Sequence, residues 1–126
     1  MNDWLKVFLE KDESHNIFVQ VPNIKGCYSQ GRNIKEAVKN IEDVIGICTE
    51  TQHIKVLDKE RQYVFRLKNF SKTIKNNRLT ALIKLGERQF VALCPELDVV
   101  SQGKNLEIAL KNLIEAVELF EEAKKK

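Results

Sequence analysis

The residues that could support catalysis are scattered along this sequence. Carboxylates occur at Asp12, Glu13, Glu36, Glu42, Asp43, Glu96 and Asp98. A two-metal nuclease needs several carboxylates that converge on neighbouring metal ions, and these positions predict no such cluster. Glu10, on a predicted strand, faces the side opposite Leu9 and has no acidic match in the second half of the chain. We therefore predict solvated surface charge in place of an acidic active site.

Histidines and cysteines also predict no reactive site. His15 and His53 are not within metal-ligand spacing of each other or of a cysteine. Cys27, Cys48 and Cys94 form no C-x-x-C pair, and their odd number leaves one unpaired. This usage is typical of reduced thiols in the cytoplasm. We predict no enzymatic activity, no metal and no cofactor.

A five-residue motif occurs twice and organises the rest of the chain. The copies are Ser29-Gln30-Gly31-Arg32-Asn33 and Ser101-Gln102-Gly103-Lys104-Asn105. Each copy closes an alternating apolar run and opens a helical pattern, which predicts an elbow from strand to helix. Asn33 and Asn105 are predicted N-caps, and Gly31 and Gly103 are predicted to give a tight reversal its backbone freedom. One glycine per copy is too few for a phosphate-binding loop, so we predict a structural role.

The neighbourhoods of the two motifs align without a gap at an offset of 72 residues (101 minus 29). Phe18-Val19 then matches Phe90-Val91, and Ala37 matches Ala109. Self-similarity at a fixed offset indicates an internal repeat. We predict a tandem duplication with a first repeat over residues 1–52, a connector over 53–78 and a second repeat over 79–126. Units below roughly 60 residues are marginal alone, so we expect the copies to share a core.

Hydrophobic periodicity predicts the elements of both copies. The predicted elements are strands over residues 5–9, 17–21 and 27–29, a helix from 33 to about 51, strands over 79–85, 89–93 and 98–101, and a helix from 105. Asn33 and Glu36 have the spacing of a capping box. Alternating strands beside one amphipathic helix predict an α+β fold with antiparallel sheets, each with a packed helix.

The connector supports two interpretations. Alternation at Tyr63, Phe65 and Leu67 predicts a strand paired with residues 53–57, and a helix over residues 56–67 is the alternative. A basic loop follows. The cations of this region are Arg61, Arg66, Lys68, Lys72, Lys75 and Arg78. These could contact phosphates while Tyr63 and Phe65 stack on bases, and steep weakening by salt would support that function.

Composition excludes several classes of protein. The chain has 126 residues, 43% hydrophobic and 31% charged, with a net charge of +3. That charge is too small to indicate nucleic-acid binding alone. No apolar run approaches the roughly 20 residues of a membrane span, and the N-terminus lacks the pattern of a signal peptide. We predict a cytoplasmic protein that does not enter membranes.

The segments before each elbow resemble the signature of the HicB-type antitoxin family. They are Val21-Pro22-Asn23-Ile24-Lys25-Gly26-Cys27 and Phe90-Val91-Ala92-Leu93-Cys94-Pro95-Glu96-Leu97. Glu36-Ala37 matches the helix start common in that family. The resemblance covers residues 5 to about 51 and 79 to 122. It implies two tandem β-β-β-α units of a truncated ribonuclease-H-like fold.

The resemblance also implies a function. Such proteins bind a small HicA-type ribonuclease toxin and mask its active site, and many carry a C-terminal DNA-binding segment that has no counterpart in this sequence. We therefore expect a non-catalytic antitoxin that binds its partner through a sheet edge or a helix face. Two units in one chain could replace the dimer of single-unit members, and homo-oligomers stay open. The alternative is a solitary HicB-like protein that binds nucleic acid through the basic connector.

Overall fold

The computed structural model describes residues 5–54 and 60–124. Within them the chain forms seven strands and three helices, so the predicted α+β class is confirmed. The chain divides into two compact units, Met1–Gln62 and Tyr63–Lys126. The predicted connector is not a separate part in this division, because most of it belongs to the second unit. No helix in the described ranges is long and apolar enough to cross a membrane.

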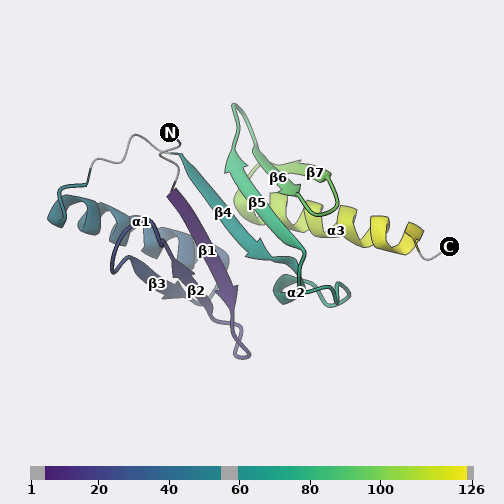
Figure 1. Cartoon of the computed structure of the whole chain (residues 1–126), viewed down its shortest axis with the longest axis horizontal. Coiled ribbons are helices and arrows are strands. Elements are labelled where there is room, and N and C mark those ends of the chain that lie inside the picture. The colour runs from purple at the N-terminus through teal and green to yellow at the C-terminus, as the bar shows by residue number, and fades with distance from the viewer. Residues whose placement is uncertain (1–4, 55–59, 125–126) are drawn as a thin grey trace. The chain divides into compact units, whose positions relative to one another are not determined.

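The first unit is an antiparallel sheet with one long helix (Figure 1). Its elements are β1 (Leu5–Lys11), β2 (Ile17–Gln20), β3 (Tyr28–Gly31) and α1 (Ile34–Thr51). The strand order is β3-β2-β1. Alternate residues Leu5, Val7 and Leu9 of β1 are buried. With Ile17 and Val19 of β2 they form the apolar side of the sheet, and the stripe Ala37, Ile41 and Ile45 forms the apolar side of α1.

The second unit has an antiparallel sheet with one more strand than the first. Its elements are β4 (Arg61–Arg66, which begins two residues before the division), α2 (Leu67–Phe70), β5 (Thr80–Leu85), β6 (Phe90–Cys94), β7 (Val99–Gly103) and α3 (Leu106–Lys124). The strand order is β4-β5-β6-β7. Helix α3 packs on β5, β6 and β7. Its buried stripe comprises Leu106, Ala109, Leu110, Leu113 and Val117.

The strand predicted around Tyr63 is confirmed as β4, so the alternative helix is wrong there. Strand β4 pairs antiparallel with β5, in which Ile83 faces Tyr63. Of the predicted partner segment 53–57, residues 55–57 lie outside the described residues, and His53 has a left-handed φ of 54° in the turn after α1. Strand β4 thus pairs with a strand that follows it in the sequence. The hydrogen bond from the N–H of Leu67 to the carbonyl of Leu79, at 3.0 Å, holds the end of β4 beside the start of β5.

The offset of 72 residues holds at the elbows but not in the strands. Leu9 faces Val19 in the first unit, and Ile83 faces Ala92 in the second, all four side chains being buried. Matching positions are therefore 74 residues apart in β1 and β5 (83 minus 9) and 73 apart in β2 and β6 (92 minus 19). The connection between β5 and β6 is therefore one residue shorter than that between β1 and β2, and the connection between β6 and β7 is one residue shorter than that between β2 and β3.

This register corrects the ungapped alignment. Phe18 does not match Phe90, because Phe90 faces Gly103 on the side covered by α3, whereas Phe18 faces Gln30 on the uncovered side of its sheet. In the second unit, the residue that corresponds to Phe18 is Val91. The same shift explains why the two prolines of the repeated segments are 73 residues apart in the sequence.

Candidate functional site

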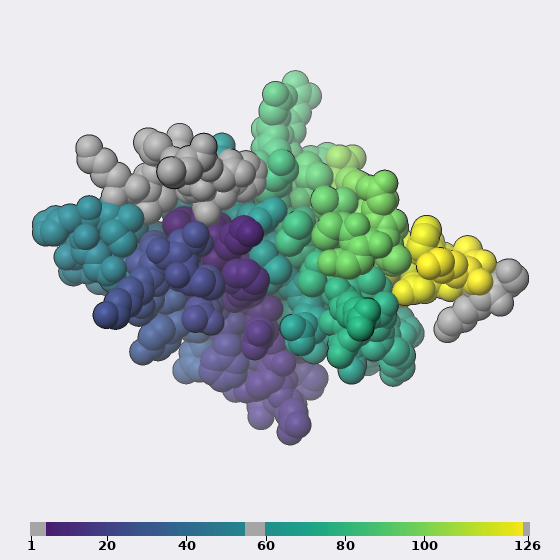
Figure 2. All heavy atoms as spheres, viewed as in Figure 1, coloured from purple at the N-terminus to yellow at the C-terminus, as the bar shows by residue number. Residues whose placement is uncertain are grey.

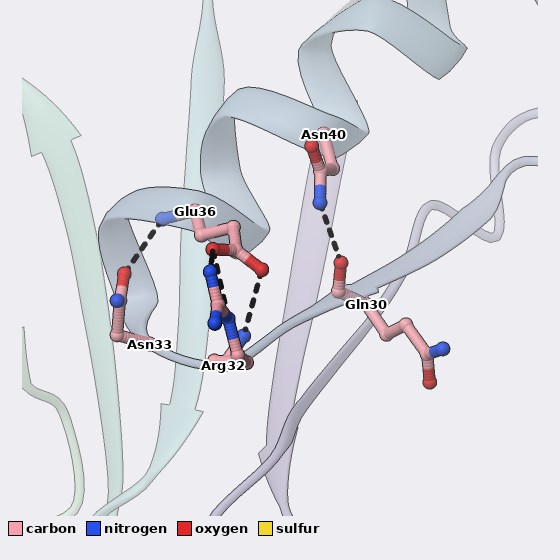
Figure 3. Close-up of polar contacts among 5 residues, drawn as sticks. All are labelled: Gln30, Arg32, Asn33, Glu36 and Asn40. Atoms are coloured by element: carbon pink, nitrogen blue, oxygen red, sulfur yellow. Dashed lines mark hydrogen bonds and ion pairs between the residues drawn. The ribbon is translucent and has the colours of Figure 1, made fainter.

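Both elbows are capped by asparagine, as predicted. The Oδ1 atom of Asn33 accepts a hydrogen bond from the N–H of Glu36 at 2.8 Å (Figure 3). The Oδ1 atom of Asn105 accepts one from the N–H of Ile108, also at 2.8 Å. The reciprocal half of the predicted capping box is displaced by one residue, because Glu36 accepts from the N–H of Arg32 at 3.2 Å. Hydrogen bonds from the Arg32 side chain and N–H hold the pKa of the Glu36 carboxyl below its usual value.

The elbow glycines have a different role from the predicted one. Gly31 and Gly103 end their strands in β conformation, and among the described glycines a positive φ belongs to Gly26. A Cβ atom on Gly31 would lie 2.4 Å from the nitrogen of Ala37, and one on Gly103 would lie 2.4 Å from that of Ala109. Glycine is needed because the first helical turn passes directly over the end of the strand.

A second asparagine in each helix binds the strand before it. The Nδ2 group of Asn40 donates to the carbonyl of Gln30 at 2.8 Å (Figure 3), and Asn112 donates to Gln102 at 2.8 Å. Strands β3 and β7 end the strand order in their units, so these amides occupy one carbonyl on each terminal strand. A partner strand added there would compete with the asparagine, which disfavours the predicted binding through a sheet edge.

Substitution of Asn105 by alanine is expected to lower the free energy of unfolding by about 1 kcal/mol, because the N–H of Ile108 loses its capping acceptor. The midpoint of urea unfolding, followed by far-ultraviolet circular dichroism, measures this effect. Asn77→Ala in an exposed loop is the control and should leave the midpoint in place. Equal midpoints for the two variants would contradict the capping role.

The side of the first sheet away from α1 carries three exposed aromatic rings. Phe8 is 36% exposed, Phe18 is 45% exposed and Tyr28 is 71% exposed. Glu10 faces Phe18, and Gln20 faces both Phe8 and Tyr28, so the rings are diagonal neighbours on adjacent strands. Together with Glu10 they line a hollow of about 260 Å³. Figure 2 shows the residues of β1–β3, coloured purple to blue, on the surface toward the viewer.

This aromatic face, defined by Phe8, Glu10, Phe18 and Tyr28, is the best candidate for a binding site. Tyrosine and phenylalanine are enriched at the centres of protein interfaces, and clustered exposed apolar groups mark interaction surfaces. This face was not among the sites predicted from the sequence. The available signal was the strand alternation, which puts Phe8 and Phe18 on the side opposite the buried Leu9 and Val19.

The predicted nucleic-acid residues differ in their exposure and contacts. The Nε atom of Arg61 lies 3.0 Å from a carboxylate oxygen of Glu42, which ties it to α1. Tyr63 and Phe65 are buried, so neither ring is accessible to a base. The other predicted cations are exposed and are distributed over β4, α2 and the following loop: Arg66, Lys68, Lys72, Lys75 and Arg78. Cations that could contact phosphates are therefore exposed, but Tyr63 and Phe65 cannot stack on bases as predicted.

The two buried thiols and the Glu96 carboxylate have structural roles. Cys27 and Cys94 are buried, and burial, with the adjacent Cys48 thiol, raises the pKa of Cys27 to about 11. A nucleophilic cysteine needs a lowered pKa, so this thiol suits core packing. Glu96 accepts hydrogen bonds from the N–H and hydroxyl of Thr80 at 2.8 and 2.7 Å. Within residues 5–54 and 60–124, no group of three or more His, Cys, Asp or Glu side chains could hold a metal ion.

Comparison with known proteins gives one family and several relatives. Residues 5–79 match the sequence model of the family described as "HicB_like antitoxin of bacterial toxin-antitoxin system". The UPF0150 protein ssr1258 of Synechocystis is 46% identical over 44 residues, 35% of this chain and 64% of the relative. UPF0150 proteins of Helicobacter pylori and Thermoplasma acidophilum are 44% and 40% identical over 32% and 36% of this chain, and over 56% and 65% of their own lengths.

These matches therefore span less than two thirds of each relative. No solved structure is a significant match to the chain. The family match includes all of β1–β3, and so it includes the aromatic face.

Proposed function

The chain belongs to the HicB-like antitoxin family of bacterial toxin–antitoxin systems, and we propose that it acts in the cytoplasm by binding and neutralising a small HicA-type ribonuclease toxin. The chain itself catalyses no reaction in this proposal. The observation that carries it is the aromatic face, which lies within the matched segment and exposes three rings on one side of a sheet. An antitoxin of this kind needs a surface for its partner and no reactive group.

The aromatic face has the properties of a preorganised binding surface. Its rings project from hydrogen-bonded strands whose opposite side packs on α1, so little backbone ordering is needed on binding. Aromatic side chains supply a large contact area with few rotatable bonds. The Asn40 amide, by binding the carbonyl of Gln30, favours docking on the face over strand addition at β3. A toxin held on this face would be excluded from RNA by steric contact.

We also propose that the two units are a tandem duplication of a truncated ribonuclease-H-like β-β-β-α unit. Corresponding hydrogen bonds support this proposal. The N–H of Lys6 donates to the Asn23 side chain at 3.0 Å, and the N–H of Thr80 donates to Glu96 at 2.8 Å, each acceptor following a proline. The N-cap and the strand-binding asparagine of each helix correspond in the same way. In this proposal the chain contains both copies that single-unit relatives would supply as two subunits.

The proposed function predicts a stable complex with the product of the adjacent reading frame, if that frame encodes a small basic protein. The two proteins should co-purify when co-expressed, and the chain should abolish RNA cleavage by the partner at an equimolar ratio. An unrelated protein of similar size and charge is the control. Failure to bind or to inhibit the partner would contradict the proposal. Binding of RNA by the chain alone, lost steeply with added salt, would favour the nucleic-acid alternative.

A further inference from the structure

The uncovered faces of the two sheets differ in chemistry at matching positions. By the strand register, Phe8, Glu10, Phe18 and Tyr28 of the first unit correspond to Leu82, Lys84, Val91 and Val100 of the second. Aromatic rings with a carboxylate are thus replaced by aliphatic side chains with an ammonium group. The buried sides match in kind, with Val7 and Leu9 corresponding to the buried Ala81 and Ile83. The difference is therefore confined to the surface that a partner would contact.

Glu10 is the charged group of the aromatic face. It faces Phe18 across the strands and lies two residues from Phe8 on β1, and all three line the hollow that Tyr28 completes. In the part of the chain that the structure describes, the Glu10 carboxylate makes no hydrogen bond or ion pair. A carboxylate among aromatic rings, without a cation of its own, complements a positively charged ligand.

We propose that the aromatic face receives an arginine or lysine side chain of the protein partner, with Glu10 as its counter-ion. Aromatic faces attract cations through the ring quadrupole. A guanidinium group can stack on a ring and also form a charge-assisted hydrogen bond with a carboxylate. The hollow of about 260 Å³ is smaller than the roughly 300–1,000 Å³ of pockets for drug-sized ligands, which suits one long side chain.

This inference rests on the proposed function and specifies the contact. A ribonuclease must attract the phosphates of RNA, so it carries cations on and around its active site. Binding one of these cations on the aromatic face would remove it from RNA and bring the sheet against the active site. The second unit carries Lys84 at the corresponding position, so it has no carboxylate there to pair with the same cation. The first unit is therefore the one that holds the toxin.

A small probe tests the site without the toxin. Amide resonances of the full-length, ¹⁵N-labelled chain are followed during titration with N-acetylarginine amide. Saturable shifts are expected at Phe8, Glu10, Phe18 and Tyr28, with at least threefold weaker binding to Glu10→Gln. N-acetylcitrulline amide, which has nearly the same shape without the charge, should cause no such shifts. Equal shifts with the citrulline compound, or shifts confined to other regions, would overturn the inference.

The toxin complex tests the same contact at full affinity. Glu10→Gln is expected to weaken toxin binding about tenfold and to reduce its salt dependence. Glu87→Gln, which removes the same charge from an exposed turn of the second unit, should change affinity less than twofold. Toxin binding that is unaffected by Glu10→Gln would sink this inference and leave the proposed function standing.

Two further outcomes separate the proposals. If the chain bound N-acetylarginine amide but not the toxin, the proposed function would be refuted and the cation site on the aromatic face would be supported. Self-association of the chain that Glu10→Gln abolishes, measured by light scattering, would identify a second copy as the occupant and overturn the inference.

Discussion

Replacing Gly31 with alanine is expected to lower the free energy of unfolding by about 3 kcal/mol, at the upper end of what overpacking usually costs. The added Cβ would lie 2.4 and 2.7 Å from the nitrogen and Cα of Ala37 and 2.9 Å from the carbonyl carbon of Glu36. These are backbone atoms of the first turn of α1, so no side-chain rotation can relieve the contact. The helix must move off the sheet, or the elbow must open and release the Asn33 cap.

The matched control is Gly46→Ala. Gly46 lies within α1, and a Cβ there would meet nothing within 4 Å. Alanine should therefore stabilise the protein by about 0.5–1 kcal/mol, the usual difference between these residues inside a helix. Urea unfolding monitored by circular dichroism gives both values. The close-approach explanation would be wrong if Gly31→Ala changed stability by no more than the control.

Gly103→Ala applies the same test to the second unit. Its Cβ would lie 2.4 Å from the nitrogen and 2.8 Å from the Cα of Ala109. A loss of stability like that of Gly31→Ala is expected, because the contact again involves backbone at the start of a helix. A large difference between the two variants would contradict a shared elbow geometry and weaken the proposal of a duplication.

Removing two rings from the aromatic face should abolish toxin neutralisation with little effect on folding. The double substitution Phe18→Ala and Tyr28→Ala is expected to weaken toxin binding by at least about 2 kcal/mol, or roughly thirtyfold, as truncation of an aromatic hot spot does. The cost in stability should be small, because Tyr28 is 71% exposed and Phe18 is 45% exposed. Isothermal titration calorimetry measures the affinity, and thermal melting verifies the fold.

The second unit supplies the control for this experiment. Val91→Ala and Val100→Ala alter the corresponding positions of β6 and β7. If the first unit holds the toxin, this pair should change affinity less than threefold. Equal effects of the two double variants would contradict a binding site confined to the first unit. An unchanged affinity for the aromatic pair would remove the aromatic face as the binding site, whatever the toxin.

The amino-acid sequence by itself determined most of the elements and the family, although it did not predict the short helix α2 over Leu67–Phe70. Strand alternation and helical spacing are local patterns, and they located the hairpin of β1 and β2 and the ends of α1 within a few residues. The N-caps were also predictable, because Asn33 and Asn105 act within one helical turn. The motifs before the two elbows were sufficient for the family, since their residue types and spacing are visible without any pairing.

Only the tertiary structure decided how the strands are paired. A change of one residue in a loop moves the matching position along the strand, and a shift of one residue turns a side chain to the other face of the sheet. That is why Phe18 matches Val91 and not Phe90. The pairing of β4 with β5 likewise joins residues far apart in the sequence, such as Tyr63 and Ile83, and the hydrogen bond from the N–H of Leu67 to the carbonyl of Leu79 adjoins it.

The elbow glycine and the aromatic face also depended on tertiary packing. The need for glycine at position 31 arises from the approach of Ala37, which is six residues later in sequence and 2.4 Å away from a Cβ at that position. The aromatic face exists because α1 packs on one side of the first sheet, at β2 and β3, and leaves Phe8, Phe18 and Tyr28 uncovered. Residue type and periodicity predict that a strand has two faces, but the packing of a helix decides which of them a partner can reach.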